Sequence, residues 1–324
     1  MKICLAPIMG VTDAVYRSTF AKYFNGVDYA IAPFISSVAA RKLKPNYLKD
    51  LFPERNSQLP VIPQILSKDA DDFLFLAEKI GELGYTEINW NLGCPSPMVI
   101  KKKRGSGLLP FPDQIDSILE KVCSSWPHKL SIKTRLGKYS ADELLKLLNV
   151  FDRYPLSEII IHPRLGVQLY KGTVDLAAFC RCLAQTRHQI VYNGDITSAV
   201  FLSGLQDELT GITTWMIGRG LLANPFLAEI CKGESRQLNS GSYRKILLQF
   251  HNEMFRQYEL LLSGPSHLLC KMKAIWKYWG HFFIDSNIIT KKVHKCVRID
   301  QYKDCIVSFF ETYPLAQLQT QAVL

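Results

Sequence analysis

One cysteine stands where a thiol can take part in chemistry. Segment 89–95, Asn-Trp-Asn-Leu-Gly-Cys-Pro, has the pattern of a short strand that ends in a Gly-Cys-Pro turn. Active sites of barrel enzymes form where strands end, and a thiol there can act as a nucleophile or as a general acid. Most single cysteines are structural, but this turn position, directly after two asparagines, favours a functional role for Cys94.

Two glycine turns, 193–195 (Asn-Gly-Asp) and 218–220 (Gly-Arg-Gly), follow the last two apolar runs of the N-terminal two thirds of the chain. In eight-stranded barrels the loops after strands seven and eight often bind phosphate through backbone N–H groups. Arg219 adds a side chain that can hold a phosphate through two N–H donors. Either turn alone is common, but the pair predicts a site for a phosphorylated cofactor or substrate.

Lys133 and His162 lie within two other apolar runs. A lysine buried without a partner is costly, which favours a functional role for Lys133. Next to the pyrimidine edge of a flavin, its charge would stabilise the reduced, anionic ring. His162 can equally be a packed histidine with backbone partners.

These residues belong to a regular series of short apolar runs bounded by turn residues. The starts of the runs are about 25 to 30 residues apart, which leaves room for a helix and two loops each time. Eight strands that alternate with helices predict a (β/α)8 TIM barrel. The runs are Ile3–Ile8, Tyr29–Ile35, Pro60–Leu66, Glu87–Leu92, Leu130–Arg135, Glu158–Arg164, Gln189–Asp195 and Thr214–Gly218.

Two of the connecting segments carry clear helical signals. Asp69–Leu83 opens with acidic residues and repeats its apolar residues at helical spacing. Ser140–Val150 begins with Ser140 and Glu143 in the spacing of a capping box. The apolar face expected for the first helix consists of Phe73, Leu76, Ala77 and Ile80.

An open, doubly wound sheet is the alternative architecture, but no G-x-G-x-x-G fingerprint follows the first run. The runs also end in polar residues, which a barrel gathers at one mouth. These residues are Gln64, Asn89, Asn91, Lys133, Arg135, His162, Arg164, Asn193, Asp195 and Arg219.

The pattern changes after about residue 235. Ser235–Ser242 resembles a polar linker, and three helical stretches follow it, at Tyr243–Leu262, Ser266–Phe283 and Ile289–Phe310. We therefore expect a catalytic barrel over 1–235 and a small helical domain over 240–324. Between residues 240 and 324 there are eleven Lys or Arg against six Asp or Glu. The net charge of +10 for the whole chain favours a polyanionic partner, nucleic acid first and an anionic membrane surface second.

Composition narrows the class of protein. The nine cysteines are scattered without a CxxC pair, and the seven histidines show no close metal-ligand spacing. We expect reduced thiols, no metal site and a cytoplasmic protein. No apolar stretch approaches the roughly 18 residues of a membrane span, and a monomer is the simplest expectation.

Six motifs together resemble the tRNA-dihydrouridine synthase family in order and spacing, over roughly residues 1–235. The resemblance extends to the branch that includes the bacterial position-16 enzyme, although these motifs do not determine which uridine is modified. The opening is Ala-Pro-Ile where the family usually has Ala-Pro-Met, and the fourth motif is His-Pro-Arg-Leu instead of His-Gly-Arg-Thr. The motifs lie at 6–13, 91–95, 133–137, 162–164, 193–195 and 218–220.

The resemblance implies an FMN cofactor reduced by NADPH and a tRNA uridine as substrate. It implies that reduced FMN gives a hydride to the C5–C6 double bond of the uridine, that Cys94 gives the proton, and that Asn91 touches the base. The flavin contacts it implies are Pro7, Ile8, Met9, Gln64, Lys133, His162, Asn193, Gly194, Asp195, Gly218 and Arg219.

For tRNA binding we expect contacts from Lys101, in the basic run 101–104, and from Arg164. In the helical tail we expect them from Lys271, Lys273 and Lys277, interleaved with Trp276 and Tyr278. The alternative for this tail helix is an amphipathic helix whose aromatic side packs on the barrel. For the whole protein, the alternatives are a flavin barrel oxidoreductase that acts on a small molecule and a non-catalytic RNA-binding protein.

Overall fold

The structure, a computed structural model, describes residues 1–39, 43, 44, 46–236 and 238–316. Its centre is a sheet of parallel strands in the order β3-β5-β6-β7-β8-β9-β10-β1-β2-β4. The strands are β1 (Lys2–Leu5), β2 (Tyr29–Ile31), β3 (Ile35–Ser36), β4 (Val61–Ile62), β5 (Gln64–Leu66), β6 (Glu87–Leu92), β7 (Lys129–Gly137), β8 (Leu156–Leu165), β9 (Ile190–Tyr192) and β10 (Thr214–Ile217).

The pairing closes this sheet into the predicted barrel. β1 pairs with β10 on one side and with β2 on the other, β2 pairs with β4, and β3 pairs with β5. β2 and β3 are therefore two parts of the second predicted strand, and β4 and β5 are two parts of the third. Pro33 follows the end of β2, and Pro63 separates β4 from β5. Proline has no N–H to donate to a ladder, which explains both interruptions.

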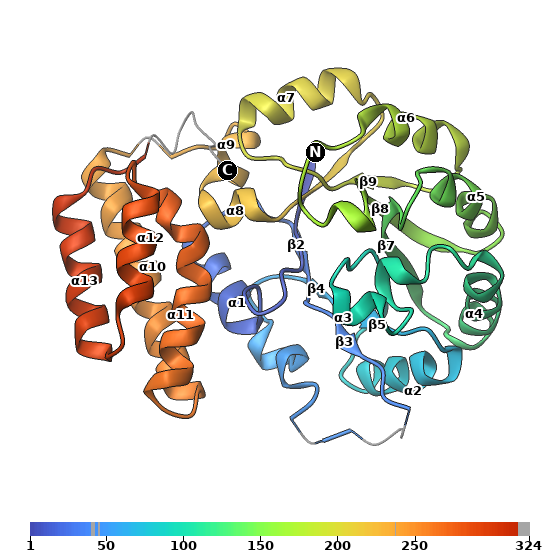
Figure 1. Ribbon diagram of the computed structural model, residues 1–324, viewed down its shortest axis with the longest axis horizontal. Helices are drawn as coiled ribbons and strands as arrows, with labels where there is room; N and C mark the ends of the chain where they lie inside the picture. Colours follow the sequence, from blue (N-terminus) through green and yellow to red (C-terminus); the bar gives the residue numbers. More distant parts are fainter. Residues whose placement is uncertain (40–42, 45, 237, 317–324) are drawn as a thin grey trace.

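Helices cover the outside of the barrel between successive strands (Figure 1). In α2, Asp69 caps the first turn and the predicted residues Phe73, Leu76, Ala77 and Ile80 are buried. The helices are α1 (Ala14–Tyr23), α2 (Ala70–Gly81), α3 (Pro97–Ile100), α4 (Pro112–Ser125), α5 (Asp142–Phe151), α6 (Leu176–Gln185), α7 (Ala199–Glu208), α8 (Arg219–Ala223) and α9 (Leu227–Cys231).

The predicted capping box of α5 is only half formed. Glu143 accepts from the backbone N–H of Ser140, as predicted, and also from those of Lys138 and Tyr139. The Ser140 hydroxyl, however, accepts from the N–H of Asp142 instead of that of Glu143. The helix begins at Asp142, two residues later than predicted, because Glu143 closes the preceding turn.

Four tail helices, α10–α13, form a separate group at the left of Figure 1. Their bounds are α10 (Ser240–Leu261), α11 (Pro265–Trp279), α12 (Ser286–Lys295) and α13 (Ile299–Thr312). The third stretch predicted for the tail is thus two helices, because the backbone adopts an extended conformation at Cys296 and Arg298. Residues 317–324 of the predicted tail domain lie outside the described residues, and the division into two domains stays a prediction.

Aromatic side chains join the tail helices to the barrel. Phe250 of α10 is fully buried, with its ring 4.9 Å from that of Phe24 and 6.0 Å from that of Tyr16, both from the α1 region. The ring of Trp279 in α11 packs against that of Phe250 in a tilted arrangement, with the ring centres 5.0 Å apart. This packing brings the tail against the first helix of the barrel, and α11 also contacts α8.

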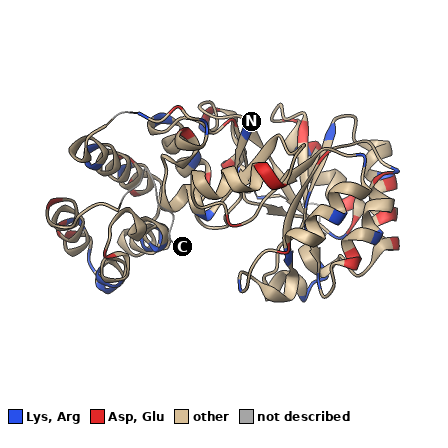
Figure 2. Ribbon diagram, turned by 90° about the horizontal axis from the view of Figure 1, so that it is seen from above, with Lys and Arg blue, Asp and Glu red and all other residues tan. Residues whose placement is uncertain are grey.

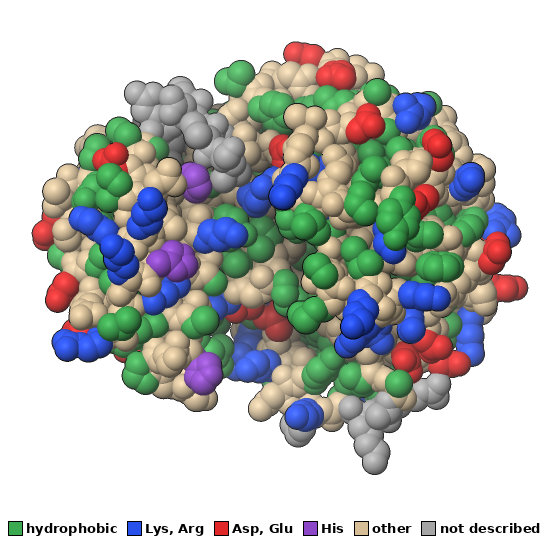
Figure 3. Space-filling model, in the orientation of Figure 1, with side chains coloured by type: hydrophobic (Ala, Val, Ile, Leu, Met, Phe, Trp, Pro, Cys, Tyr) green, Lys and Arg blue, Asp and Glu red, His purple; other side chains and the backbone are tan. Residues whose placement is uncertain are grey.

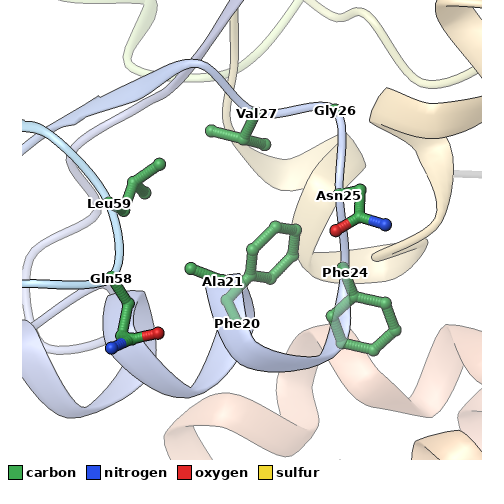
Figure 4. Close-up of a pocket in the computed structure, with 8 residues that line it drawn as sticks. All are labelled: Phe20, Ala21, Phe24, Asn25, Gly26, Val27, Gln58 and Leu59. Carbon is green, nitrogen blue, oxygen red and sulfur yellow. The ribbon is translucent and has the colours of Figure 1, made fainter.

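A cavity of about 190 Å³ lies in the barrel away from these motifs (Figure 4). It lies between the end of α1 and the loop before β4, which is at the N-terminal end of the strands. Phe20, Phe24 and Leu59 form much of its wall, and no charged side chain lines it. None of the predicted site residues lies there.

The described residues contain neither a cluster of metal ligands nor a helix suited to a membrane. No group of three or more His, Cys, Asp or Glu in that part of the chain could hold a metal ion. Within the same residues, no helix combines the length and apolar character needed to cross a membrane. All nine cysteines are free thiols.

Candidate active site

A buried network of amides builds the turn that carries Cys94. The Gln64 side chain accepts from the Asn91 amide at 2.7 Å and donates to the Asn89 amide oxygen at 2.7 Å. Asn89 in turn donates to Ser131 of β7 at 2.9 Å. The network fixes the end of β6 against both neighbouring strands, and sequence reasoning placed these polar residues at the mouth without finding their partners.

Asn91 orients the turn directly. Its side-chain oxygen accepts from the backbone N–H of Gly93 at 3.1 Å and from that of Cys94 at 2.9 Å. Asn91 is 7% exposed, so little of its surface is open to a substrate. The observed role of its oxygen is to position Cys94, and its contact with a uridine stays a prediction.

The Cys94 thiol is half-buried and remains protonated at neutral pH. Burial raises its pKa above the ordinary value, although a hydrogen bond from the backbone at Ser96 and the charges of Arg135 and Lys133 oppose this. A protonated thiol can donate a proton but is a poor nucleophile. Of the two roles that the sequence left open, the environment of Cys94 favours the general acid.

The basic loop after Cys94 packs back on the turn. Ser106 donates from its backbone and from its hydroxyl to the carbonyl of Cys94, both at 3.1 Å. Gly105 has φ of +56°, and a Cβ there would lie 2.7 Å from the same carbonyl. This close approach leaves Lys101, Lys102 and Lys103 exposed beside the turn.

Four cations surround a neutral histidine at the mouth. Burial, followed by the charges of Arg135, Lys133, Arg164 and Arg219, lowers the pKa of His162 well below its ordinary value. Arg164 lies 3.1 Å from the Nε2 atom of His162. Because a guanidinium only donates, Nε2 accepts and the proton of the neutral ring is on Nδ1. The mouth therefore carries an excess of positive charge that suits an anionic ligand.

Lys133 is the least compensated of these cations. Burial, and next the charge of Arg135, lowers its pKa from 10.5 to about 7, against weaker opposing effects of Cys4 and Cys94. In the described part of the chain, no hydrogen bond or ion pair of its ammonium group is found. An ammonium in this position fits an anionic partner supplied by a ligand.

Asp195 accounts for two of the arginines. It binds Arg164 through both carboxylate oxygens and Arg219 through Oδ1 at 2.6 Å. Although burial opposes it, these arginines hold the pKa of Asp195 below its ordinary value. Arg164 also donates to the carbonyl of Gly172 at 2.7 Å and is only 2% exposed. The guanidinium of Arg164 is thus bound inside the protein, and its direct contact with tRNA stays a prediction.

The two glycine loops lie together as predicted. Asn193 donates to the carbonyl of Met216 at 2.9 Å and so ties the loop after β9 to β10. A Cβ at Gly220 would lie 2.1 Å from the carbonyl oxygen of Ile196, which leaves no room for a side chain. Asp195 has φ of +43°, unusual for a residue other than glycine. Such close backbone packing, with two donor groups of Arg219 still free of Asp195, fits a phosphate group.

The loop after β1 borders the same site. The backbone N–H of Ile8 donates to Thr12 Oγ1 at 2.8 Å, and a Cβ at Gly218 would lie 3.5 Å from Ile8 Cδ1. Pro7 and Ile8 are half-buried, whereas the Met9 side chain is 54% exposed. The structure thus brings the first, seventh and eighth loops of the barrel together, as the motifs predicted.

Tyr170 is a candidate residue that the sequence analysis missed. It is 58% exposed, and its ring lies 5.3 Å from the Arg135 guanidinium and 5.4 Å from that of Arg219. The preceding residue, Leu169, has φ of +55°, so the backbone is held in an uncommon conformation there. No local sequence signal marks this tyrosine, because its partners come from β7 and from the start of α8, both distant in the sequence.

The tail residues separate into two groups. Lys277 is exposed and Lys273 is half-buried, so both can reach a bound tRNA. Trp276, in contrast, is fully buried and donates to Tyr302 at 2.7 Å. Trp276 therefore belongs to the core of the tail. The helix is amphipathic, as the alternative expected, but this aromatic side chain packs on other tail residues and not on the barrel.

Lys271, a predicted tRNA contact, has its observed partners inside the protein. Its ammonium group lies 2.6 Å from Asp13 and donates to the carbonyl of Gly10 at 2.7 Å, so it is bound to the barrel. The exposed lysines of α12 were not among the predicted tRNA contacts, although a Lys-Lys-x-x-Lys run marks them in the sequence. Basic side chains gather on the visible face of the tail in Figure 3, and Figure 2 shows that Lys and Arg also extend over the barrel. The α12 lysines are Lys291, Lys292 and Lys295.

Comparison with solved structures supports the class of fold. A morphinone reductase mutant in complex with tetrahydroNAD aligns with a TM-score of 0.53 and 9% identity, over 72% of this chain and 87% of that protein. Histamine dehydrogenase from Rhizobium sp. 4-9 gives a TM-score of 0.53 and 10% identity, over 72% of this chain and 46% of that protein. At such low identity these matches show the α/β barrel alone.

Sequence comparison gives the family. The family model of dihydrouridine synthase (Dus) matches residues 4–281, and the chain belongs to this family. A probable tRNA-dihydrouridine synthase of Rhodobacter capsulatus is 27% identical, over 81% of this chain and 80% of that protein. A tRNA-dihydrouridine(16) synthase of Vibrio vulnificus is 26% identical, over 98% of this chain and 100% of that protein. The chain is therefore an oxidoreductase that forms dihydrouridine in tRNA, in preference to the small-molecule alternative.

Proposed function

We propose that this enzyme reduces uridine 16 of tRNA with an FMN cofactor at the barrel mouth and NADPH as the reductant. The observation that carries the proposal is the protonated Cys94 thiol beside a group of cations that, among the described residues, is paired with the single carboxylate of Asp195. Such a site has a proton donor and an affinity for anions, which are the two properties that this reduction requires. The name of the Vibrio vulnificus relative, which aligns with this chain over its full length, supports the choice of position 16.

The residues present fit FMN. The phosphate would be held by the backbone around Gly194 and Gly218 and by Arg219, where a Cβ at either glycine would lie 3.0 to 3.3 Å from the nearest neighbouring side chain. Pro7 and Ile8 would border the ring, with Met9 extending from the same loop. Lys133 would sit at the electron-rich edge of the ring, since its own charge has no partner within the described chain. When bound, FMN supplies the hydride for C6 of the uridine.

His162 and Gln64 complete the proposed cofactor site by hydrogen bonding. His162 is neutral, with Nδ1–H as a donor and Nε2 already occupied by Arg164. Gln64 keeps one amide hydrogen that is used by neither Asn89 nor Asn91. Asn193 and Asp195 act by fixing the phosphate loop and Arg219.

Cys94 would protonate C5 of the uridine. Asn91 holds the backbone of Cys94, so the thiol has a fixed place relative to the ring of the base. The base must leave the stack of the folded tRNA to reach this thiol, because C5 and C6 are covered inside a helix. Tyr170 offers an exposed aromatic face for the extruded base.

The rest of the tRNA would bind basic side chains around the mouth. Lys101 and its neighbours lie beside the catalytic turn, and Lys273 and Lys277 lie on the tail. The exposed lysines of α12 extend this surface. Contacts of this kind neutralise phosphates without reading sequence, so they give affinity and orientation.

Cys94→Ala tests the acid. We expect reduction of the flavin by NADPH to persist, whereas reduction of uridine in unmodified tRNA slows about 100-fold or more, since proton transfer is lost. The two half-reactions are measured separately, by flavin absorbance in stopped flow and by mass spectrometry of dihydrouridine.

Mapping of dihydrouridine in tRNA from cells that lack the gene checks the position. Loss at position 16, restored by wild type and not by Cys94→Ala, supports the proposal. Equal loss of both half-reactions in the variant would contradict the role of Cys94, and loss at another position would contradict uridine 16.

A further inference from the structure

Asp13 is the meeting point of the barrel and two tail helices. Its Oδ1 atom accepts from the backbone N–H of Tyr16 at 3.1 Å, which caps α1. The same oxygen accepts from the hydroxyl of Tyr258 in α10 at 2.6 Å, and Oδ2 binds the ammonium of Lys271 in α11 at 2.6 Å. One carboxylate therefore fixes three helices at a single point.

Lys271 extends this connection to the loop that borders the proposed cofactor site. Its ammonium donates to the carbonyl of Gly10, one residue beyond Met9, and lies 4.8 Å from the centre of the Tyr258 ring. Gly10 has φ of +78°, a conformation suited to glycine. The Lys271 side chain is only 13% exposed, so its charge is satisfied within the protein.

The remainder of this interface is mainly apolar. The ring of Phe250 packs on the α1 aromatics, and Trp279 packs on Phe250. Apolar burial stabilises contact but is not directional, whereas a charge-assisted hydrogen bond fixes distance and angle. The aromatic cluster can hold the tail to the barrel, while the Asp13 contacts restrict how the tail is turned.

We propose that Asp13 and Lys271 are a positioning pair that holds the tail at the angle needed to present the target nucleotide to Cys94. The proposal rests on the proposed function, because the tail is taken to bind the tRNA. Lys271 acts here through Asp13 and Gly10 and does not touch RNA. Loss of the pair changes how often a bound tRNA is productively placed. Removal of both members takes away one positive and one negative charge, so the net charge seen by the RNA phosphates stays the same.

The test compares Lys271→Met with Lys273→Met, a matched change on the same helix. For Lys271→Met we expect the turnover of unmodified tRNA under saturation to fall about tenfold, since small misplacements of a substrate slow reactions strongly. The dissociation constant of tRNA should change less than about threefold, and its dependence on salt should stay that of wild type. For Lys273→Met the salt slope should fall by about 0.7 to 0.9, the amount for one phosphate contact.

Two more variants guard against a folding defect. Lys271→Arg keeps the charge and the donors and should recover most of the turnover. Asp13→Asn keeps the oxygen that caps α1 but loses the charge, and it should reproduce the Lys271→Met defect. The double variant should be no worse than either single one by more than about twofold, because both remove the same interaction.

The outcomes separate the possible roles of Lys271. A reduced salt slope for Lys271→Met would show a phosphate contact and overturn the proposal, as would an unchanged turnover. A fall in turnover that Lys271→Arg does not recover, with normal flavin content, would also contradict it. A wild-type enzyme that forms no dihydrouridine would contradict the proposed function itself, and with it the positioning role. Failure of the positioning role alone is recognised by a wild-type enzyme that is active and a Lys271→Met variant that behaves in one of the contradictory ways above.

Discussion

At the scale of single residues, burial and nearby charge set the protonation states that the reaction needs. Cys94 keeps its proton because burial outweighs the neighbouring cations, and His162 stays neutral for the same two reasons acting together. Lys133 is held close to the point where it loses its charge. An anion at the mouth would therefore meet cationic or protonated groups. The one acceptor atom of the neutral His162 ring, Nε2, already binds Arg164.

Lys133 should leave a signature in the stability of the protein without cofactor. Its pKa is about 7 in the folded protein and near 10.5 when unfolded, so between these pH values the unfolded chain binds more protons. Below pH 7 the cost of burying the charged lysine lowers the free energy of unfolding, and this cost disappears as the pH rises from about 7 to 10.5. We expect Lys133→Met to be more stable than wild type at pH 6 and to lose that advantage progressively towards pH 10.

Urea unfolding of both proteins at several pH values measures this difference, and taking the difference removes the titration of other groups. A difference that does not change with pH would mean that Lys133 has its usual pKa in the folded protein.

At the scale of elements, the site depends on loops that are packed as closely as a core. The turn after β10 has no room for a methyl group at Gly220, because Ile196 of the preceding loop lies against it. The turn after β6 is held by the Ser106 contacts from the basic loop. Rigid loops of this kind keep binding groups in place before a ligand arrives.

Gly220→Ala tests this packing. The new Cβ would meet a backbone carbonyl that cannot rotate away, so we expect a loss of about 2 to 3 kcal/mol in the free energy of unfolding. Flavin content after purification should fall as well, since the loop must move.

Gly204→Ala is the matched control. Gly204 lies inside α7 with nothing within 4 Å of the added Cβ, so the change should stabilise the protein by about 0.5 to 1 kcal/mol. Denaturant unfolding and flavin absorbance measure both variants, and a neutral Gly220→Ala would show that this loop adapts.

At the scale of the whole molecule, the barrel and the tail share one apolar cluster. Phe250 is fully buried between α1 and α11, although it belongs to the helical tail. The same interface carries the polar contacts of Asp13. Packing of this kind predicts that the tail and the barrel unfold together.

Phe250→Ala should therefore lower the free energy of unfolding of the complete chain by about 3 to 5 kcal/mol, in a single transition. Phe201→Ala is the control, because that ring lies on α7 and is 39% exposed, and it should change stability by less than about 1 kcal/mol. Differential scanning calorimetry follows both variants. Two separate transitions in wild type would contradict the shared unit.

The sequence by itself determined the barrel and most of the groups at its mouth. Strand positions repeat at a fixed interval, and parallel strands deliver their ends to one face, so Cys94, Lys133, His162 and Arg219 could be placed together before their contacts were known. The same logic predicted a phosphate site at the two glycine loops, because glycine turns after the last two strands of a barrel often bind phosphate. Local patterns were sufficient where the chain order itself sets the spatial order.

Only the tertiary structure decided which charged and polar side chains are free to contact a ligand. Arg164, Lys271 and Trp276 all look suited to RNA in the sequence, yet Asp195, Asp13 and Tyr302 use their polar groups inside the protein. Tyr170 shows the reverse case. Nothing in the sequence marks this tyrosine, yet the fold places its ring close to Arg135 of β7 and Arg219 of α8. An ion pair or a buried hydrogen bond depends on partners far away in the chain, and residue type alone carries no information about that distance.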